Sequence, residues 1–123
     1  MVYIIGAGPG DPELITVKGQ RLLKEADVII YAGSLVNPAL LDYAKADCEI
    51  YNSASMTLGE VIETITAAEQ EGKMTVRLHT GDPAIYGAIQ EQMDELSRRN
   101  IEYTVIPGVS SFLATAAALK QEY

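Results

Sequence analysis

The chain is poor in the residues from which most metal sites and disulfides are built. Its 123 residues include one cysteine, Cys48, and one histidine, His79. A single cysteine cannot form an intramolecular disulfide, which indicates a reducing compartment, so we expect a cytoplasmic protein. One histidine and one cysteine without a surrounding cluster of acids predict no metal site. No arrangement typical of a serine or cysteine nucleophile is present either.

Basic residues and long apolar runs are also scarce. Nine Lys and Arg residues stand against 17 Asp and Glu residues, which gives a formal charge of −8. The basic residues are scattered, with one local pair at Arg98 and Arg99. This pattern argues against nucleic acid and anionic membranes as partners, since both require clustered positive charge. No segment approaches the roughly 20 apolar residues of a membrane span, and the short apolar start ends at Gly6, which predicts no signal peptide.

What the chain does contain is a regular alternation of strand-like and helix-like segments. β-Branched apolar runs predict strands at residues 2–5, 28–31, 49–51, 74–78 and 103–106. Apolar residues at helical spacing predict helices at residues 13–26, 38–44, 83–99 and 110–119. A further helix is predicted to begin at a capping box formed by Thr57 and Glu60 and to end at Gly72. The alternation predicts an α/β fold in one domain, with a five-stranded, mainly parallel sheet and helices on both faces.

Glycine-rich loops follow three of the predicted strands. They are Gly-Ala-Gly-Pro-Gly-Asp at residues 6–11, His-Thr-Gly-Asp-Pro-Ala-Ile-Tyr-Gly at residues 79–87, and Pro-Gly-Val-Ser-Ser at residues 107–111. The carboxyl ends of parallel strands meet at one edge of a sheet, so the loops predict a single small-molecule site there. Glycine lets the backbone approach a ligand closely, and helix N-termini offer unpaired N–H groups.

The same loops also have purely structural interpretations. Asp11 can cap the first helix, Asp82 and Pro83 can begin the helix at 83–99, and the serines at the end of the third loop can cap the last helix. His79 lies at a strand end, where a histidine is more often structural than catalytic. Two matched loops at matching strand ends favour ligand binding over a pair of unrelated turns.

The first loop differs from the dinucleotide-binding fingerprint. Its third glycine comes one residue early, Pro9 lies inside the turn, and residues 31–33 contain no acid for a ribose. A nucleotide-dependent oxidoreductase is therefore disfavoured, although it stays an alternative. A ligand-binding or oligomerisation module without enzymatic activity is the other.

In their order and spacing, these loops resemble those of the tetrapyrrole methylase family. The segments that carry the resemblance are residues 6–16, 26–31, 80–83 and 105–111. The resemblance implies transfer of a methyl group from S-adenosylmethionine to corrin and porphyrin precursors. Residues 31–36 and 79–92 look most similar to members that methylate C11 of precorrin-4 or cobalt-precorrin-4, in cobalamin biosynthesis. Methylation at a ring position other than C11 is the alternative.

The resemblance also implies a domain arrangement and a set of site residues. Family members have two α/β domains with the cofactor in the cleft between them, and residues 1–123 resemble the N-terminal one. Homodimers are expected. The cofactor-binding residues implied are Pro9, Thr80, Gly81, Asp82, Ile85, Ser110 and Ser111.

No catalytic residue follows from the resemblance. Some relatives carry a general base after the second strand, but Ala32 and Gly33 stand there in this sequence. The substrate is rich in carboxylates, so cations are expected from the C-terminal domain or from local residues such as Arg77.

Overall fold

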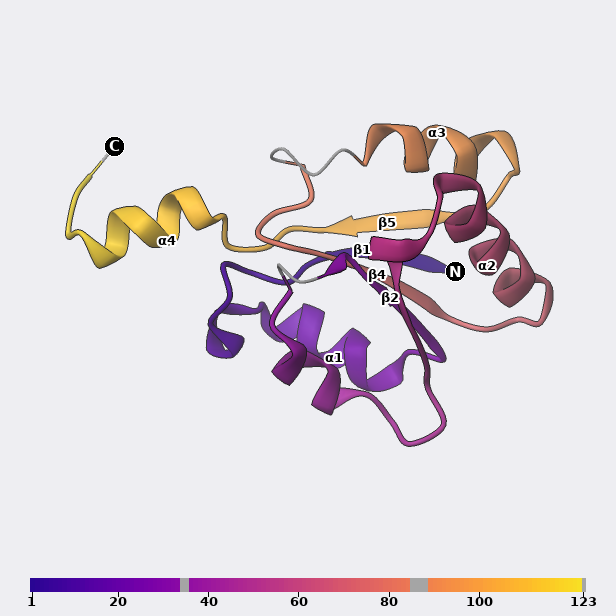
Figure 1. Cartoon of the computed structure of the whole chain (residues 1–123), viewed down its shortest axis with the longest axis horizontal. Helices are drawn as coiled ribbons and strands as arrows, with labels where there is room; N and C mark the ends of the chain where they lie inside the picture. The colour runs from indigo at the N-terminus through magenta and orange to yellow at the C-terminus, as the bar shows by residue number, and fades with distance from the viewer. Residues whose placement is uncertain (34–35, 85–88, 123) are drawn as a thin grey trace.

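A computed structural model describes residues 1–33, 36–84 and 89–122 of the chain (Figure 1). Within these ranges one sheet contains five strands in the order β3-β2-β4-β1-β5, and every neighbouring pair is parallel. The strands are β1 (Val2–Gly6), β2 (Val28–Tyr31), β3 (Glu49–Asn52), β4 (Thr75–His79) and β5 (Tyr103–Ile106). The predicted sheet is confirmed, and it is parallel throughout because each strand returns to the same edge through a crossover.

Helices cover both faces of this sheet, as the alternation predicts. The helices are α1 (Val17–Glu25), α2 (Leu58–Gln70), α3 (Gln90–Arg98) and α4 (Ser111–Ala118), with short 3-10 helices η1 (Pro12–Leu14), η3 (Pro38–Tyr43) and η4 (Ser53–Ser55). Figure 1 shows α1 on one side of the sheet and α2 and α3 on the other. Ile5 and Ile29 pack in the core beneath α1, whereas their neighbours Ile4 and Ile30 pack in the core beneath α2 and α3. Strands β1 and β2 are apolar runs because both of their faces are largely buried, whereas the edge strand β3 is exposed.

The start of the first helix differs from the prediction. Residues 12–14 form η1, and α1 begins only at Val17. Asp11 accepts a hydrogen bond from the backbone N–H of Glu13 and caps η1, while Thr16 accepts from the N–H of Gly19 and caps α1. Thr16 is extended (ψ 153°), which separates the two elements. Asp11 therefore does not cap the first long helix.

The helix predicted at 83–99 is also shorter. Its regular part, α3, begins at Gln90, and the N-cap position is Ile89, whose side chain makes no capping hydrogen bond. Asp82 and Pro83 therefore do not begin this helix, and residues 85–88 lie outside the described ranges. The capping box of α2 is confirmed, with Thr57 and Glu60 bonding to each other's backbone N–H groups.

The last helix, α4, lies beyond the carboxyl edge of the sheet, away from both helix layers (Figure 1). Its Ala116 is buried, but Phe112, Leu113 and the following Leu119 are between 55% and 60% exposed. These three side chains give the end of the chain an apolar surface. Across the described ranges, no helix combines the length and the hydropathy needed to cross a membrane.

A line of polar side chains crosses the core beneath α2 and α3. Arg77 in the middle of β4 is only 6% exposed, and it is paired in register with Ile30 of that core. Its Nε donates to Oε1 of Gln92 (3.0 Å), and a terminal nitrogen donates to the carbonyl of Ile30 (3.2 Å). Burial lowers the pKa of Arg77 to about 10, which leaves it charged at neutral pH.

We expect Gln92→Leu to destabilise the fold by about 1–3 kcal/mol, because a buried charged donor then loses its acceptor. The exposed Gln90→Leu is the matched control on the same helix, with an expected effect within about 0.5 kcal/mol. Urea unfolding measures both. Adding Arg77→Met to Gln92→Leu should recover part of the loss, because it removes the unpaired charge. A Gln92→Leu protein as stable as the wild type would contradict this account.

Candidate functional site

Three loops meet at the carboxyl edge of the sheet, because β4, β1 and β5 are adjacent and parallel. The loop after β1 and the loop after β4 pair through Gly8 and Gly81. The N–H of Gly81 donates to the carbonyl of Gly8 (2.8 Å), and the N–H of Gly8 donates to the carbonyl of Gly81 (3.2 Å). The prediction that these loops share one edge agrees with the geometry.

The glycines at this edge allow the backbones to touch one another. A Cβ atom on Gly6 would lie 2.5 Å from the carbonyl oxygen of Gly81 and 2.6 Å from Cα of Gly108. A Cβ atom on Gly108 would collide with the same oxygen. Packing between the loops therefore requires both glycines. The sequence interpretation had explained the glycines by close approach of the backbone to a ligand.

Asp82 connects two of the loops. Its Oδ1 accepts from the N–H of Ala84 (2.7 Å), and its Oδ2 accepts from the N–H of Gly108 (3.2 Å). Strand β1 lies between β4 and β5, so this carboxylate links the ends of two strands that do not pair with each other. The interpretation of Asp82 as a cap of the helix at 83–99 is wrong, because α3 begins only at Gln90 and has Ile89 at its N-cap position.

The other predicted site residues are distributed around this junction. Ser110 is buried, and its Oγ accepts from the N–H of Phe112, so it caps α4 as expected. Ser111 is the exposed first residue of α4, and Pro9 and Thr80 are half-buried in the first two loops. Ile85 lies outside the described residues.

One contributor to the site, Asn37, was missed by the sequence interpretation. Its Nδ2 donates to the carbonyl of Gly10 (2.7 Å), and its Oδ1 accepts from the N–H of Ala39 at the start of η3. It therefore anchors the first loop to the segment that follows β2. The available signal was Asn37-Pro38, a pair typical of a helix start, but such a pair does not reveal the contact with Gly10.

His79 and Arg77 do not present charge at this edge. His79 is 7% exposed, and burial together with the nearby Arg77 charge lowers its pKa to about 4, so it is neutral at pH 7. Its Nε2 has no hydrogen-bond partner among the described residues. The guanidinium of Arg77 is held in the core by Gln92 and Ile30. The expectation that Arg77 helps to bind substrate carboxylates is therefore not supported by its position.

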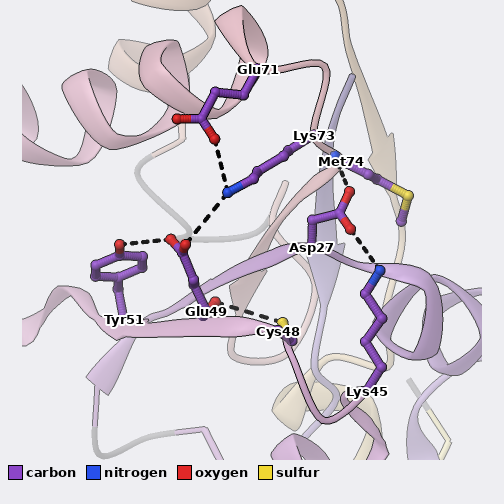
Figure 2. Close-up of polar contacts among 8 residues, drawn as sticks. All are labelled: Asp27, Lys45, Cys48, Glu49, Tyr51, Glu71, Lys73 and Met74. Carbon is purple, nitrogen blue, oxygen red and sulfur yellow. Dashed lines mark hydrogen bonds and ion pairs between the residues drawn. The ribbon is translucent and has the colours of Figure 1, made fainter.

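A group of paired charged side chains lies at the amino edge of the sheet, and Figure 2 shows its contacts. Asp27 pairs with Lys45 (2.6 Å) and accepts from the N–H of Met74 (2.8 Å), and these contacts lower the pKa of Asp27. Lys73 contacts both Glu49 and Glu71. These pairs join the starts of β2, β3 and β4, at the opposite end from the three loops.

Cys48 and a surface pocket also lie at this amino edge. Burial raises the pKa of the Cys48 thiol, and its Sγ donates to the carbonyl of Glu49, which does not favour a nucleophilic role. The pocket, about 400 Å³ in volume, is lined by residues of β3 and α2 and by Lys73. Neither feature contributes to the edge where the three loops meet.

Comparison with known proteins identifies the class to which this fold and these loops belong. The chain belongs to the tetrapyrrole (corrin/porphyrin) methylase family, whose model matches residues 1–123. The resemblance inferred from the loops is thereby confirmed.

Two curated relatives and two solved structures show the extent of the similarity. The chain is 63% identical over 121 residues to the cobalt-precorrin-4 C(11)-methyltransferase of Methanocaldococcus jannaschii, covering 98% of this chain and 47% of that protein. It is 49% identical to the precorrin-4 C(11)-methyltransferase of Pseudomonas aeruginosa, and the match covers 96% of this chain and 47% of that protein. A cobalt precorrin-4 methyltransferase structure superposes with a TM-score of 0.96 at 53% identity, covering 98% of this chain and 51% of that one.

A uroporphyrin-III C-methyltransferase of Thermus thermophilus, solved with S-adenosyl homocysteine, superposes with a TM-score of 0.79. It is 38% identical and covers 94% of this chain and 47% of that one. The chain thus spans about half the length of the curated relatives it matches.

We expect His79 to make the fold sensitive to acid. The unfolded chain protonates this ring below its ordinary pKa of 6.5, whereas the folded chain does so only below about 4. The contribution of His79 to stability is thus full above pH 6.5 and falls by about 3 kcal/mol as the pH drops to 4. His79→Gln should remove this component, and the difference between wild-type and variant unfolding free energies at pH 7 and pH 4 measures it. Parallel pH curves for the two proteins would contradict the prediction.

Proposed function

We propose that this chain is the N-terminal domain of an S-adenosylmethionine-dependent methyltransferase that acts at C11 of precorrin-4 or cobalt-precorrin-4. The observation that carries the proposal is the 63% identity to a cobalt-precorrin-4 C(11)-methyltransferase over 98% of this chain. Precorrin-4 without cobalt is kept as a candidate substrate because the chain is also similar, at a lower identity of 49%, to the precorrin-4 C(11)-methyltransferase of Pseudomonas aeruginosa. Methylation of another ring position is the next candidate, because uroporphyrinogen-III C-methyltransferases are also similar.

The residues at the carboxyl edge fit a cofactor of this kind. Gly10 has a φ of +117°, and a Cβ atom there would meet nothing within 4 Å, so the first loop has open space beside it. A Cβ atom on Gly81 would point at the backbone of Ser110 and Ser111, about 3.7 Å away. We propose that the cofactor is held here by Pro9, Thr80, Gly81, Asp82, Ile85, Ser110 and Ser111.

The geometry limits how Gly81 can take part. Its N–H and its carbonyl are already paired with Gly8. Its contribution is therefore the close approach that its bare Cα permits, rather than a new backbone hydrogen bond. In this segment, hydrogen bonds to a ligand are instead assigned to the neighbouring Thr80 and to the peptide groups after Gly81.

When bound, S-adenosylmethionine would supply an electrophilic methyl group: a nucleophilic ring carbon would bond to the methyl carbon as its bond to sulfur breaks, and S-adenosylhomocysteine would leave. The role of this chain is to hold the reactants in line and to exclude water on its side of the cleft. His79 is buried and neutral, so it does not serve as a proton acceptor at the surface of the site. The base that removes the ring proton is not among the residues to which the proposal gives a role.

The polycarboxylate substrate requires cations, and the three loops at residues 6–11, 79–87 and 107–111 contain no lysine or arginine. Arg77 is committed to the core, and the lysines Lys45 and Lys73 pair with acids at the opposite edge. We propose that a second domain supplies them, since the curated relatives are about twice as long as this chain. A homodimer in the cytoplasm is part of the same proposal.

We expect Gly81→Val to weaken S-adenosylhomocysteine binding by the full-length protein by at least about tenfold. The valine side chain blocks the approach to the loop and adds strain at a φ of +60°. Gly72→Val is the matched control, with a φ of +71° and open space beyond the end of α2. Titration calorimetry measures both variants, and an NAD titration of the wild type tests the oxidoreductase alternative.

Affinity should stay within about twofold for the Gly72→Val control. Unchanged affinity in Gly81→Val would contradict the assignment of this loop to the cofactor. Binding of NAD without binding of S-adenosylhomocysteine would overturn the proposed function.

Residues 1–123 alone are expected to melt cooperatively but to form no methylated product. The two core layers are complete, whereas the loops form only one wall of the proposed cleft. An incomplete site loses alignment and leaves the reacting groups in water. An assay with labelled cofactor compares this chain with the full-length protein, and circular dichroism checks that the chain is folded. Comparable turnover by the two would contradict the two-domain proposal and indicate that a dimer of this domain completes the site.

A further inference from the structure

The Asp82 carboxylate links two of the loops that form the proposed site. It is half-buried, and each of its oxygens already accepts a hydrogen bond from a backbone N–H. One bond, to Ala84 at 2.7 Å, stays within the loop after β4. The other, to Gly108 at 3.2 Å, reaches the loop after β5 across the end of β1.

The position of Gly108 makes this second bond informative. Its Cα packs against Gly6, and no side chain fits between it and the carbonyl of Gly81. The backbone at Gly108 therefore has little freedom, and its N–H points at Asp82. Two residues later Ser110 caps α4, so the start of that helix is set by the same junction.

We infer that Asp82, besides its proposed place beside the cofactor, is a positioning residue that fixes the geometry of the cofactor site proposed above. Its negative charge strengthens both hydrogen bonds, since bonds from N–H groups to a carboxylate are stronger than those to a neutral acceptor. The bond to Gly108 holds Ser110 and the start of α4 against the loop that contains Gly81. Asp82 thus determines the relative position of two of the three loops.

Replacing Asp82 by asparagine allows the effects of the two hydrogen bonds to be distinguished. The amide of Asp82→Asn keeps one oxygen, which can continue to accept from Ala84 within the local turn, but its NH₂ group cannot accept from Gly108. Asp82→Ala loses both bonds. Asp11 provides the matched control, because its carboxylate forms the same kind of local turn, through the N–H of Glu13 two residues further along the chain.

Hydrogen–deuterium exchange of the full-length protein, without ligand, tests the bond directly. We expect exchange in the peptide containing Gly108 to be at least about fivefold faster in both Asp82 variants, and exchange at Ala84 to be faster only in Asp82→Ala. Asp11→Asn should leave exchange at Gly108 unchanged. Unaltered exchange at Gly108 in Asp82→Ala would overturn the inference, whether or not the protein binds the proposed cofactor.

Affinity for S-adenosylhomocysteine, measured well below the melting temperature, separates positioning from a general loss of stability. We expect affinity to fall by about tenfold in Asp82→Ala and by about threefold in Asp82→Asn, in step with exchange at Gly108. Loss of affinity without faster exchange would indicate direct contact with the ligand and overturn the inference. Faster exchange with full affinity would also overturn it, because the bond would then serve the fold alone. If the wild type fails to bind, the proposed function fails, while the exchange experiment still tests the bond itself.

Discussion

The contact that the rest of this structure depends on is the meeting of three backbones at the carboxyl edge of the sheet. The backbones of the loops that leave β4, β1 and β5 can touch one another only where the residues at the contact lack side chains. Gly6 and Gly108 meet this condition. The pairing of Gly8 with Gly81, the reach of Asp82 to Gly108 and the start of α4 all follow from that approach.

The sheet and the faces of the helices could be predicted from the sequence because the signals are local and repeated. Strands β1 and β2 are short apolar runs buried on both sides, and the helical crossovers carry an apolar stripe. The helix starts were predicted less well. Thr16 competes with Asp11 as a cap, and the choice between them depends on the turn geometry around Pro12. Asp82 is beside Pro83 in the sequence, but one of its partners is 26 residues away, which no local pattern reveals.

The meeting of the loops at one edge was predicted correctly, but the contacts of the residues within them were predicted only in part. Asn37 was missed because its bond to Gly10 joins segments 27 residues apart. Arg77 was misjudged because it lies in the middle of a strand with both faces covered, so its side chain had to be inside the core. In such a strand, a charged residue is better interpreted as a partner for a buried polar group, here Gln92, than as a surface cation.

The distribution of charge explains why one half of the proposed site is insufficient for a substrate rich in carboxylates. Lys45 and Lys73 are neutralised by Asp27, Glu49 and Glu71 at the amino edge, where they hold the strands together. Arg98 and Arg99 contact Glu95 on α3. The three loops at the carboxyl edge are built instead from glycine, serine and peptide groups around the Asp82 carboxylate, which suit close approach to a compact ligand. In a site made in this way the two walls of the cleft have different roles. Under the proposed function, this domain positions the methyl donor, and the positive charge that binds the ring substrate is assigned to the other wall.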